Sequence, residues 1–299
     1  MPEMSPLKIP KPVQFLVELF FFGNLFIAVC AASLVQLTYL QLGLHPHIDG
    51  ATVLVFGSTL CIYALHRLLI IRQTADDEKN MIRAWARRNA FFLLMFLLAG
   101  AGLASLAVFH LRLLSVVLLV CLGVLSLMYE FPIVPYKGRF LKIRHIWVFK
   151  PVWLLLVWVV STSVVPALEQ QVPMLDGRVA LLVLERSILI LFLVLSFDLR
   201  DLEYDRREGV KTLAVLFGEK KVFAYYRALL ALAVLIALVH YLVLSRQTDL
   251  LTARLLNLLL TYYIVSNKRW PRSELYYALL VDGCMLFQFL LTWLMTSLF

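Results

Sequence analysis

The chain has 299 residues, of which 62% are hydrophobic and 16% are charged, and its net charge is +9. Soluble globular domains contain about 45–50% apolar and about 25% charged residues, so the composition excludes a soluble globular protein and predicts an integral membrane protein. We interpret the positive charge as a sign of membrane topology and of contact with anionic lipid headgroups, and we expect no nucleic-acid partner.

Nine apolar segments follow one another along the chain, each close to the length that crosses a bilayer as a helix. We therefore predict an all-α polytopic membrane protein with about nine transmembrane helices. No linker or low-complexity tract divides the chain, so residues 1–299 are predicted to form a single domain. The segments are 13–40, 51–71, 90–108, 111–129, 147–165, 179–197, 222–244, 251–265 and 275–299.

The connections between these segments alternate in charge. Cytoplasmic connections of membrane proteins carry an excess of Lys and Arg, and most of the basic residues here fall on one predicted side. The amino terminus is therefore predicted to be cytoplasmic and the carboxyl terminus to lie on the opposite side. The basic residues of the cytoplasmic side are Lys8, Lys11, Arg72, Lys79, Arg83, Arg87, Arg88, Lys137, Arg139, Lys142, Arg144, Arg200, Arg206, Arg207, Lys211, Lys220, Lys221, Lys268, Arg269 and Arg272.

A series of carboxylates follows the sixth apolar segment. If the helix continues outward, Asp198, Asp201 and Asp205 project from one face. Their mutual repulsion is relieved when a divalent cation lies among them, and hard oxygen ligands suit Mg²⁺ that carries a phosphate. Arg206 and Lys211 follow closely and can take up the remaining phosphate charge. The alternative interpretation is a solvated, salt-bridged loop.

The whole run from Asp198 to Gly218 resembles the second aspartate-rich motif of the UbiA superfamily of intramembrane prenyltransferases. Its core is Asp201-x-x-x-Asp205, followed by Gly209-Val210-Lys211-Thr212 and a closing glycine. The resemblance implies helices around a central cavity open to the cytoplasmic side, with Mg²⁺ as cofactor. It also implies that Asp201 and Asp205 are catalytic metal ligands and that Asp198 is an auxiliary ligand.

The first aspartate-rich motif of that superfamily should follow the second apolar segment, and here it is degenerate. With Tyr63 in the place of the usual asparagine, Arg67 and Ile71 occupy the aspartate positions. The later acidic cluster 76–78 is interpreted as a solvated loop. A functional alternative is that His66 and Arg67, which are polar groups within an apolar segment, bind phosphate oxygens directly in place of one metal.

The basic stretch that follows Tyr129 resembles a third region of the superfamily, which helps to hold the diphosphate. This resemblance implies a phosphate contact by Lys137. The alternative is a topology signal with tryptophans as interfacial anchors. Lys150 differs from the other cations because it begins an apolar segment, so it must pair, reach toward the interface or serve the site.

Three further ionisable groups lie within apolar segments. Glu185 and Arg186 are adjacent and point about 100° apart on a helix, so they need separate partners or a shared cavity. Asp282 lies mid-segment, and an isolated carboxylate there is costly. It should be protonated, paired with a cation such as Arg186, or facing the cavity, and we favour a structural pair over a catalytic role.

These observations favour an intramembrane prenyltransferase that transfers a polyprenyl group from its diphosphate to an unidentified lipophilic or aromatic acceptor. The alternative is a non-catalytic UbiA-like membrane protein that binds an isoprenoid lipid, because the first motif is altered. A transporter is less well supported, since no pair of broken helices occurs at mid-membrane. A CDP-alcohol phosphotransferase would require an Asp-Gly and Ala-Arg lead-in, which the aspartate run here lacks.

Overall fold

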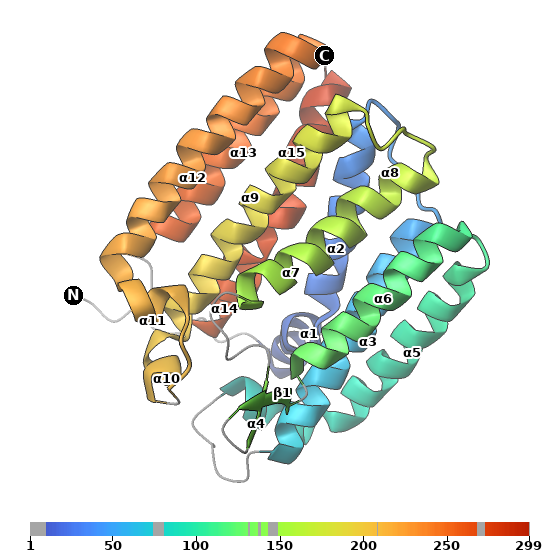
Figure 1. Cartoon of the computed structure of the whole chain (residues 1–299). Coiled ribbons are helices and arrows are strands. Elements are labelled where there is room, and N and C mark those ends of the chain that lie inside the picture. Colours follow the sequence, from blue (N-terminus) through green and yellow to red (C-terminus); the bar gives the residue numbers. More distant parts are fainter. Residues whose placement is uncertain are drawn as a thin grey trace.

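A computed structural model describes residues 10–73, 81–130, 132–136, 139–142, 149–207, 209–267 and 273–298. Long helices run antiparallel to one another and make up nearly all of the described chain (Figure 1). The predicted all-α polytopic membrane fold is thereby confirmed. In chain order the elements are α1 (Lys11–Phe22), α2 (Leu25–Gln41), α3 (Gly50–Gln73), α4 (Met81–Arg88), α5 (Ala90–Val108), α6 (Leu113–Glu130), β1 (Pro132–Tyr136), β2 (Arg139–Lys142), α7 (Phe149–Val159), α8 (Val165–Glu169), α9 (Gly177–Arg200), α10 (Leu202–Arg207), α11 (Leu213–Phe217), α12 (Glu219–His240), α13 (Thr248–Ser266), α14 (Glu274–Tyr276) and α15 (Gly283–Leu298). Three π-helical segments join or extend them at Val160–Val164, Tyr241–Ser245 and Tyr277–Val281.

Each of the nine predicted apolar segments overlaps a helix. Within the described residues, six helices are long and apolar enough to cross a membrane, and a seventh span arises if α1 and α2, bent by 52°, count as one. The helix that covers Leu113–Met128 is apolar but shorter. Nine complete spans therefore stay a prediction.

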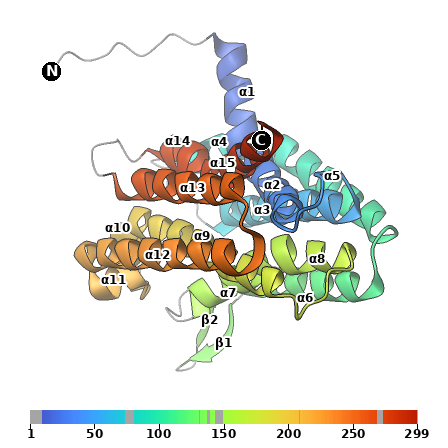
Figure 2. The same ribbon diagram turned by 90° about the horizontal axis from the view of Figure 1, so that it is seen from above.

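The helices pack through extensive apolar contacts. α2 packs against α3 and α15, α13 lies between α15 and α12, and α9 contacts both α12 and α7. Seen from above, α1 leaves this bundle at an angle (Figure 2). The largest core cluster, which includes Phe26, Leu34, Leu193, Tyr277 and Met285, fills the space where α2, α9 and α15 meet. A central cavity open to the cytoplasmic side therefore stays a prediction.

The basic stretch after α6 differs from the open loop that the sequence suggested. β1 and β2 form a two-stranded antiparallel hairpin, in which Pro135 is opposite Phe140 and Tyr136 is opposite Arg139. The pairing brings the chain back toward the start of α7.

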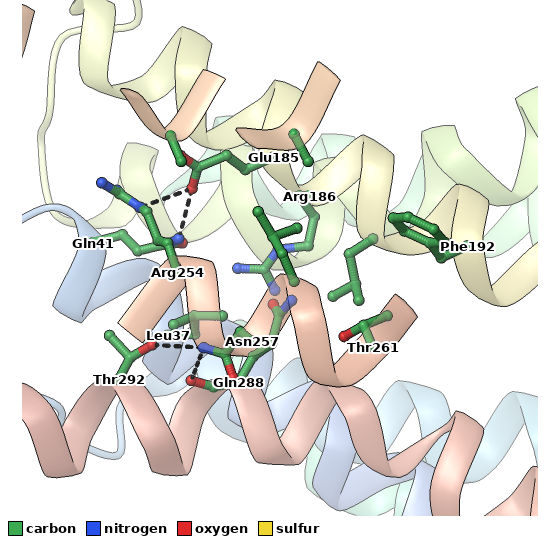
Figure 3. A pocket seen from close by; sticks show the side chains of 14 residues that line it. Leu37, Gln41, Glu185, Arg186, Phe192, Arg254, Asn257, Thr261, Gln288 and Thr292 are labelled. Atoms are coloured by element: carbon green, nitrogen blue, oxygen red, sulfur yellow. Dashed lines mark hydrogen bonds and ion pairs between the residues drawn. The ribbon is translucent and has the colours of Figure 1, made fainter. Parts of the chain in front are cut away.

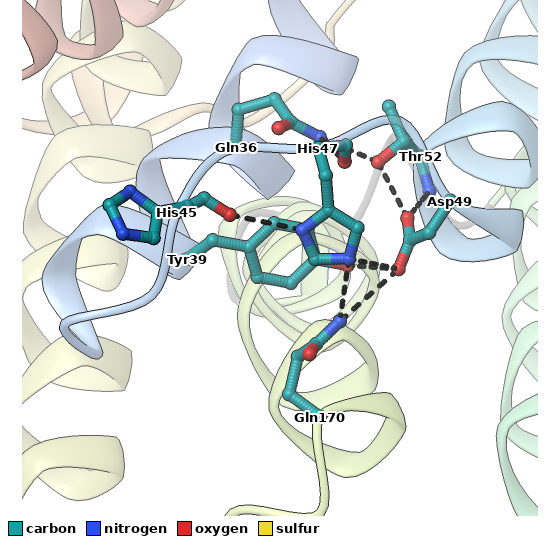
Figure 4. A network of polar contacts seen from close by, with 7 residues as sticks. All are labelled: Gln36, Tyr39, His45, His47, Asp49, Thr52 and Gln170. Atoms are coloured by element: carbon teal, nitrogen blue, oxygen red, sulfur yellow. Dashed lines mark hydrogen bonds and ion pairs between the residues drawn. The ribbon is translucent and has the colours of Figure 1, made fainter.

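A polar network anchors the connection between α2 and α3 (Figure 4). Asp49 caps α3 by accepting hydrogen bonds from the backbone N–H and the hydroxyl of Thr52, at 2.9 and 2.7 Å. Its other oxygen accepts a 2.6 Å hydrogen bond from the hydroxyl of Tyr39, which is fully buried. Gln170, which follows α8, donates to Asp49 at 3.4 Å. The network thus ties α2, α3 and α8 together at one end of the bundle.

Two glycines allow α3 and α5 to approach each other closely. A Cβ atom at Gly57 would lie 2.7 Å from the carbonyl oxygen of Gly100, and one at Gly100 would lie 2.6 Å from the carbonyl oxygen of Gly57. Membrane helices commonly meet through small residues of this kind, because they permit backbone contact. The adjacent turn of α5 offers a control, since a Cβ atom at Gly102 would meet nothing within 4 Å.

We predict that Gly100→Ala lowers the free energy of unfolding by about 1–3 kcal/mol, because the added methyl group forces the two backbones apart. Gly102→Ala should cause no loss. Thermal denaturation of the purified protein in detergent measures both. Equal melting temperatures for the two variants would contradict the close α3–α5 contact.

Candidate active site

Three carboxylates mark one end of the bundle, which we call the Asp-rich end: Asp198, Asp201 and Asp205. The predicted single helix is wrong here. α9 ends at Arg200, Asp201 is its C-cap at φ −88° and ψ 2°, and α10 begins at Leu202. The carboxylates therefore lie on a bend, with a 2.8 Å hydrogen bond from the backbone N–H of Asp205 to the carbonyl oxygen of Asp201 across it. The periodicity of the aspartates gave no sign of this bend.

The innermost carboxylate forms an ion pair with Lys150. The Nζ atom of Lys150, in the first turn of α7, lies 2.6 Å from Oδ1 of Asp198. Asp198 is only 1% exposed, and the backbone N–H of Leu213 also donates to its carboxylate. Of the three alternatives that the sequence left open for Lys150, the structure shows pairing, and the lysine neutralises a carboxylate that packing removes from solvent.

The middle carboxylate is held by its neighbour. Nε and Nη2 of Arg200 donate to the two oxygens of Asp201 at 2.8 and 3.1 Å. Nη1 of Arg200 lies 3.8 Å from Glu274, and its guanidinium covers the rings of Phe197 and Tyr277, at 4.8 and 5.4 Å from their centroids. Arg200 therefore joins the end of α9 to the start of α14, a role that the sequence did not reveal.

Asp282 does not lie against Arg186, which the sequence suggested as a possible partner. The cation whose charge acts on Asp282 is Arg200. The reason is the position along each helix: Asp282 precedes α15 near the Asp-rich end, whereas Arg186 lies more than three turns before the end of α9.

The outermost carboxylate is buried and only partly satisfied. Asp205 is 7% exposed, and its Oδ2 atom has no hydrogen-bond partner. Burial raises the pKa of Asp205, and so do the charges of Asp201 and Asp198, while Lys150 and a hydrogen bond from Thr212 oppose the rise. A cation at this position would relieve both the unsatisfied oxygen and the mutual repulsion.

The altered first motif reaches the same end of the bundle. Nη2 of Arg67, on α3, donates to Oδ1 of Asn24 at 3.1 Å, and Arg67 is within electrostatic range of Arg200 and Glu274. Asn24 lies at the bend between α1 and α2 with a left-handed backbone, at φ 67°. His66 is half-buried beside the ring of Tyr63, at 6.4 Å between centroids. The cation that replaces an aspartate thus faces the second motif.

The remaining predicted phosphate ligands are less constrained. Arg206 and Lys211 are exposed beyond the bend. Lys137 and the acidic cluster 76–78 fall outside the described residues. Asn24 and Glu274 belong to the site geometry but carried no sequence signal, because only helix packing brings them near α3 and α9.

A comparison with protein-family models decides the affiliation of the chain. The model of the UbiA prenyltransferase family matches residues 83–291. The chain belongs to the UbiA prenyltransferase family. The UbiA match begins after the degenerate first motif and includes the whole run from Asp198 to Gly218. No curated protein and no solved structure matches the chain.

Members of this family generally bind the diphosphate through Mg²⁺, so the carboxylates were tested for their fit to that ion. In the part of the chain that the structure describes, no group of three or more acidic, histidine or cysteine side chains has a geometry ready to hold a metal. The donor chemistry nevertheless fits, since Asp201 and Asp205 are hard oxygen donors and Asp205 has a buried oxygen without a partner. Asp198, held by Lys150, fits less well as a direct ligand.

The buried ion pair generates a test of stability. We predict that Lys150→Met lowers the free energy of unfolding by about 3–5 kcal/mol, because it leaves Asp198 buried without its counter-charge. Adding Asp198→Asn to this variant should restore part of the loss. Thermal denaturation of the detergent-purified proteins gives both values.

The control for that test is Arg207→Gln. Arg207 pairs with Glu203 at 3.9 Å, and both side chains are more than four-fifths exposed, so its loss should not measurably change stability. If Lys150→Met were equally harmless, the ion pair would not be formed in the protein.

Proposed function

We propose that the chain is an intramembrane prenyltransferase whose diphosphate site combines an acidic half with a cationic half. The acidic half consists of Asp198, Asp201 and Asp205, and the cationic half consists of Arg67 and Lys150. The observation that carries the proposal is the buried Oδ2 atom of Asp205, which has no hydrogen-bond partner. Arg67 is within electrostatic range of Arg200, which binds Asp201. Family membership supports the reaction class.

The acidic half and the cationic half would each stabilise the diphosphate leaving group in a different way. Asp201 and Asp205 would hold Mg²⁺. Asp198 would act as an auxiliary ligand once its ion pair with Lys150 opens. When bound, Mg²⁺ neutralises the charge that builds up on the departing diphosphate. Arg67 takes the place of the second metal by offering a fixed positive charge and N–H donors that match phosphate oxygens.

Further basic groups complete the phosphate site in this proposal. Arg206 and Lys211 are exposed after the bend and free to close over a diphosphate. His66 and Lys137 are the remaining candidate contacts. Together these cations stabilise the diphosphate as the allylic C–O bond breaks, which is mainly electrostatic catalysis.

The substrates follow from the surroundings of the site. A polyprenyl diphosphate would place its tail among the apolar helices and its diphosphate at the Asp-rich end, which the charge pattern puts on the cytoplasmic side. The acceptor is a lipophilic or aromatic molecule in the same membrane. The allylic cation reacts with it once the diphosphate has left.

We predict that Asp201→Asn and Asp205→Asn each abolish Mg²⁺-dependent pyrophosphate release from geranylgeranyl diphosphate, while the proteins stay folded. The physical reason is the loss of one of the two hard anionic ligands that would hold the ion directly. Glu203→Gln is the matched control, because Glu203 lies on the same short helix with an 85% exposed side chain. Normal turnover by both aspartate variants would refute the proposal.

A second candidate function is a non-catalytic relative that binds an isoprenoid lipid. It is favoured by the ion pairs that already occupy two of the carboxylates, Lys150 with Asp198 and Arg200 with Asp201. On this view the pairs are permanent and Mg²⁺ is not required. Calorimetric binding of geranylgeranyl diphosphate that is unaffected by Mg²⁺ and by both aspartate variants would support the second candidate over the enzyme.

A further inference from the structure

A second group of buried charges lies around Glu185, at a distance along α9 from the Asp-rich end; most of its members line the pocket in Figure 3. Glu185 and Arg186 come from α9, His240 from the end of α12 and Arg254 from α13. Glu185 precedes Asp198 by thirteen residues of one helix, which corresponds to about 20 Å. This group is therefore separate from the candidate active site.

Glu185 lies close to several polar groups, although its Oε1 atom, Nδ1 of His240 and Nε of Arg254 have no hydrogen-bond partner. Nε of Arg254 lies 3.2 Å from its Oε2 atom, and Gln41 donates to the same oxygen at 2.9 Å. Nδ1 of His240 lies 3.5 Å from Oε1. The other ring nitrogen of His240 is 3.4 Å from Nη2 of Arg254. Because a guanidinium can only donate, this contact is a hydrogen bond in the tautomer whose Nε2 carries no hydrogen.

Arg186 has no comparable partner. It is 2% exposed, and Nη2 donates to the hydroxyl of Thr38 at 3.2 Å, while Nη1 has no hydrogen-bond partner. Among the described residues, Glu185 is the one carboxylate whose charge acts on Arg186 or on Arg254. Two guanidiniums thus share a single carboxylate, and the group carries one excess positive charge within the apolar bundle.

The excess charge adjoins a cavity of about 40 Å³. The guanidinium of Arg186 points into it between α9 and α13, near Asn257 and Thr261 (Figure 3). One water molecule needs roughly 10–15 Å³, so the space holds a few waters or one small ion. Water could satisfy the free N–H of Arg186, but it would leave the charge uncompensated, which is costly in an apolar interior.

We propose that this cavity is a binding site for a small monovalent anion of the size of chloride. A single negative charge makes the group neutral, whereas a divalent oxyanion would overshoot by one charge. The anion accepts from Nη1 of Arg186 and lies in the field of Arg254. It links α9 to α13 and makes the stability of the bundle depend on chloride.

The test compares melting temperatures of the full-length protein in detergent as chloride replaces gluconate at constant ionic strength. Wild type should gain several degrees along a saturable curve, since an ion that binds only the folded state stabilises it. Bromide should act like chloride, and sulfate should not. Arg186→Gln should abolish the chloride response and, in gluconate, should be at least as stable as wild type because the excess charge is gone.

Arg178→Gln is the matched control. Arg178 lies on the same helix but is part-exposed and paired with Asp176 at 2.7 Å, so this variant should keep the chloride response. A wild-type melting temperature indifferent to chloride, or an undiminished response in Arg186→Gln, would overturn the proposal. If Arg186→Gln does not fold, equilibrium dialysis of wild type with radioactive chloride decides: one site per chain supports the proposal, and no binding refutes it.

Discussion

The cost of placing a charge among apolar helices governs the arrangement of this protein. Hydrocarbon offers no hydrogen bonds, so each ionised group within the bundle needs a partner from another helix. Lys150 meets Asp198 across α7 and α9, and Arg254 meets Glu185 across α13 and α9. These pairs lie near opposite ends of α9, the helix to which both polar groups belong. Between these two polar groups, α9 packs against its neighbours through apolar side chains.

The same constraint explains why the degenerate first motif is compatible with diphosphate chemistry. In a site with two metal ions, a cation at position 67 would be repelled by the metal that a second set of aspartates holds. Here the groups that neighbour Arg67 are Asn24, Arg200 and Glu274. Arg67 and Arg200 repel each other unless an anion or Glu274 compensates them. In the proposed site, a bound diphosphate would supply that negative charge, and one metal held by Asp201 and Asp205 would complete the balance. The fixed charge of Arg67 would then replace a second metal.

Much of this was readable from the sequence, and the rest depended on packing. Hydropathy located the helices, and the run from Asp198 to Gly218 indicated the family. The position of Lys150 in an apolar segment allowed a partner, a reach toward the interface or a role in the site, and the structure shows the partner. The bend at Asp201 was not predictable, because the aspartates keep a helical spacing through it. For Asp282 the sequence suggested Arg186 as one possible cation, whereas the cation whose charge acts on it is Arg200, because the stagger of α15 against α9 decides which of the two is nearer. The lone charge of Arg186 became apparent only when the partners of Glu185 could be counted.

The most direct test of the mixed acidic and cationic site is an experimental structure with Mg²⁺ and a non-hydrolysable geranylgeranyl thiodiphosphate. The account predicts one metal ion bound by Asp201 and Asp205, with the guanidinium of Arg67 in contact with a phosphate oxygen. A diphosphate that is bridged by two metal ions and makes no contact with Arg67 would contradict it.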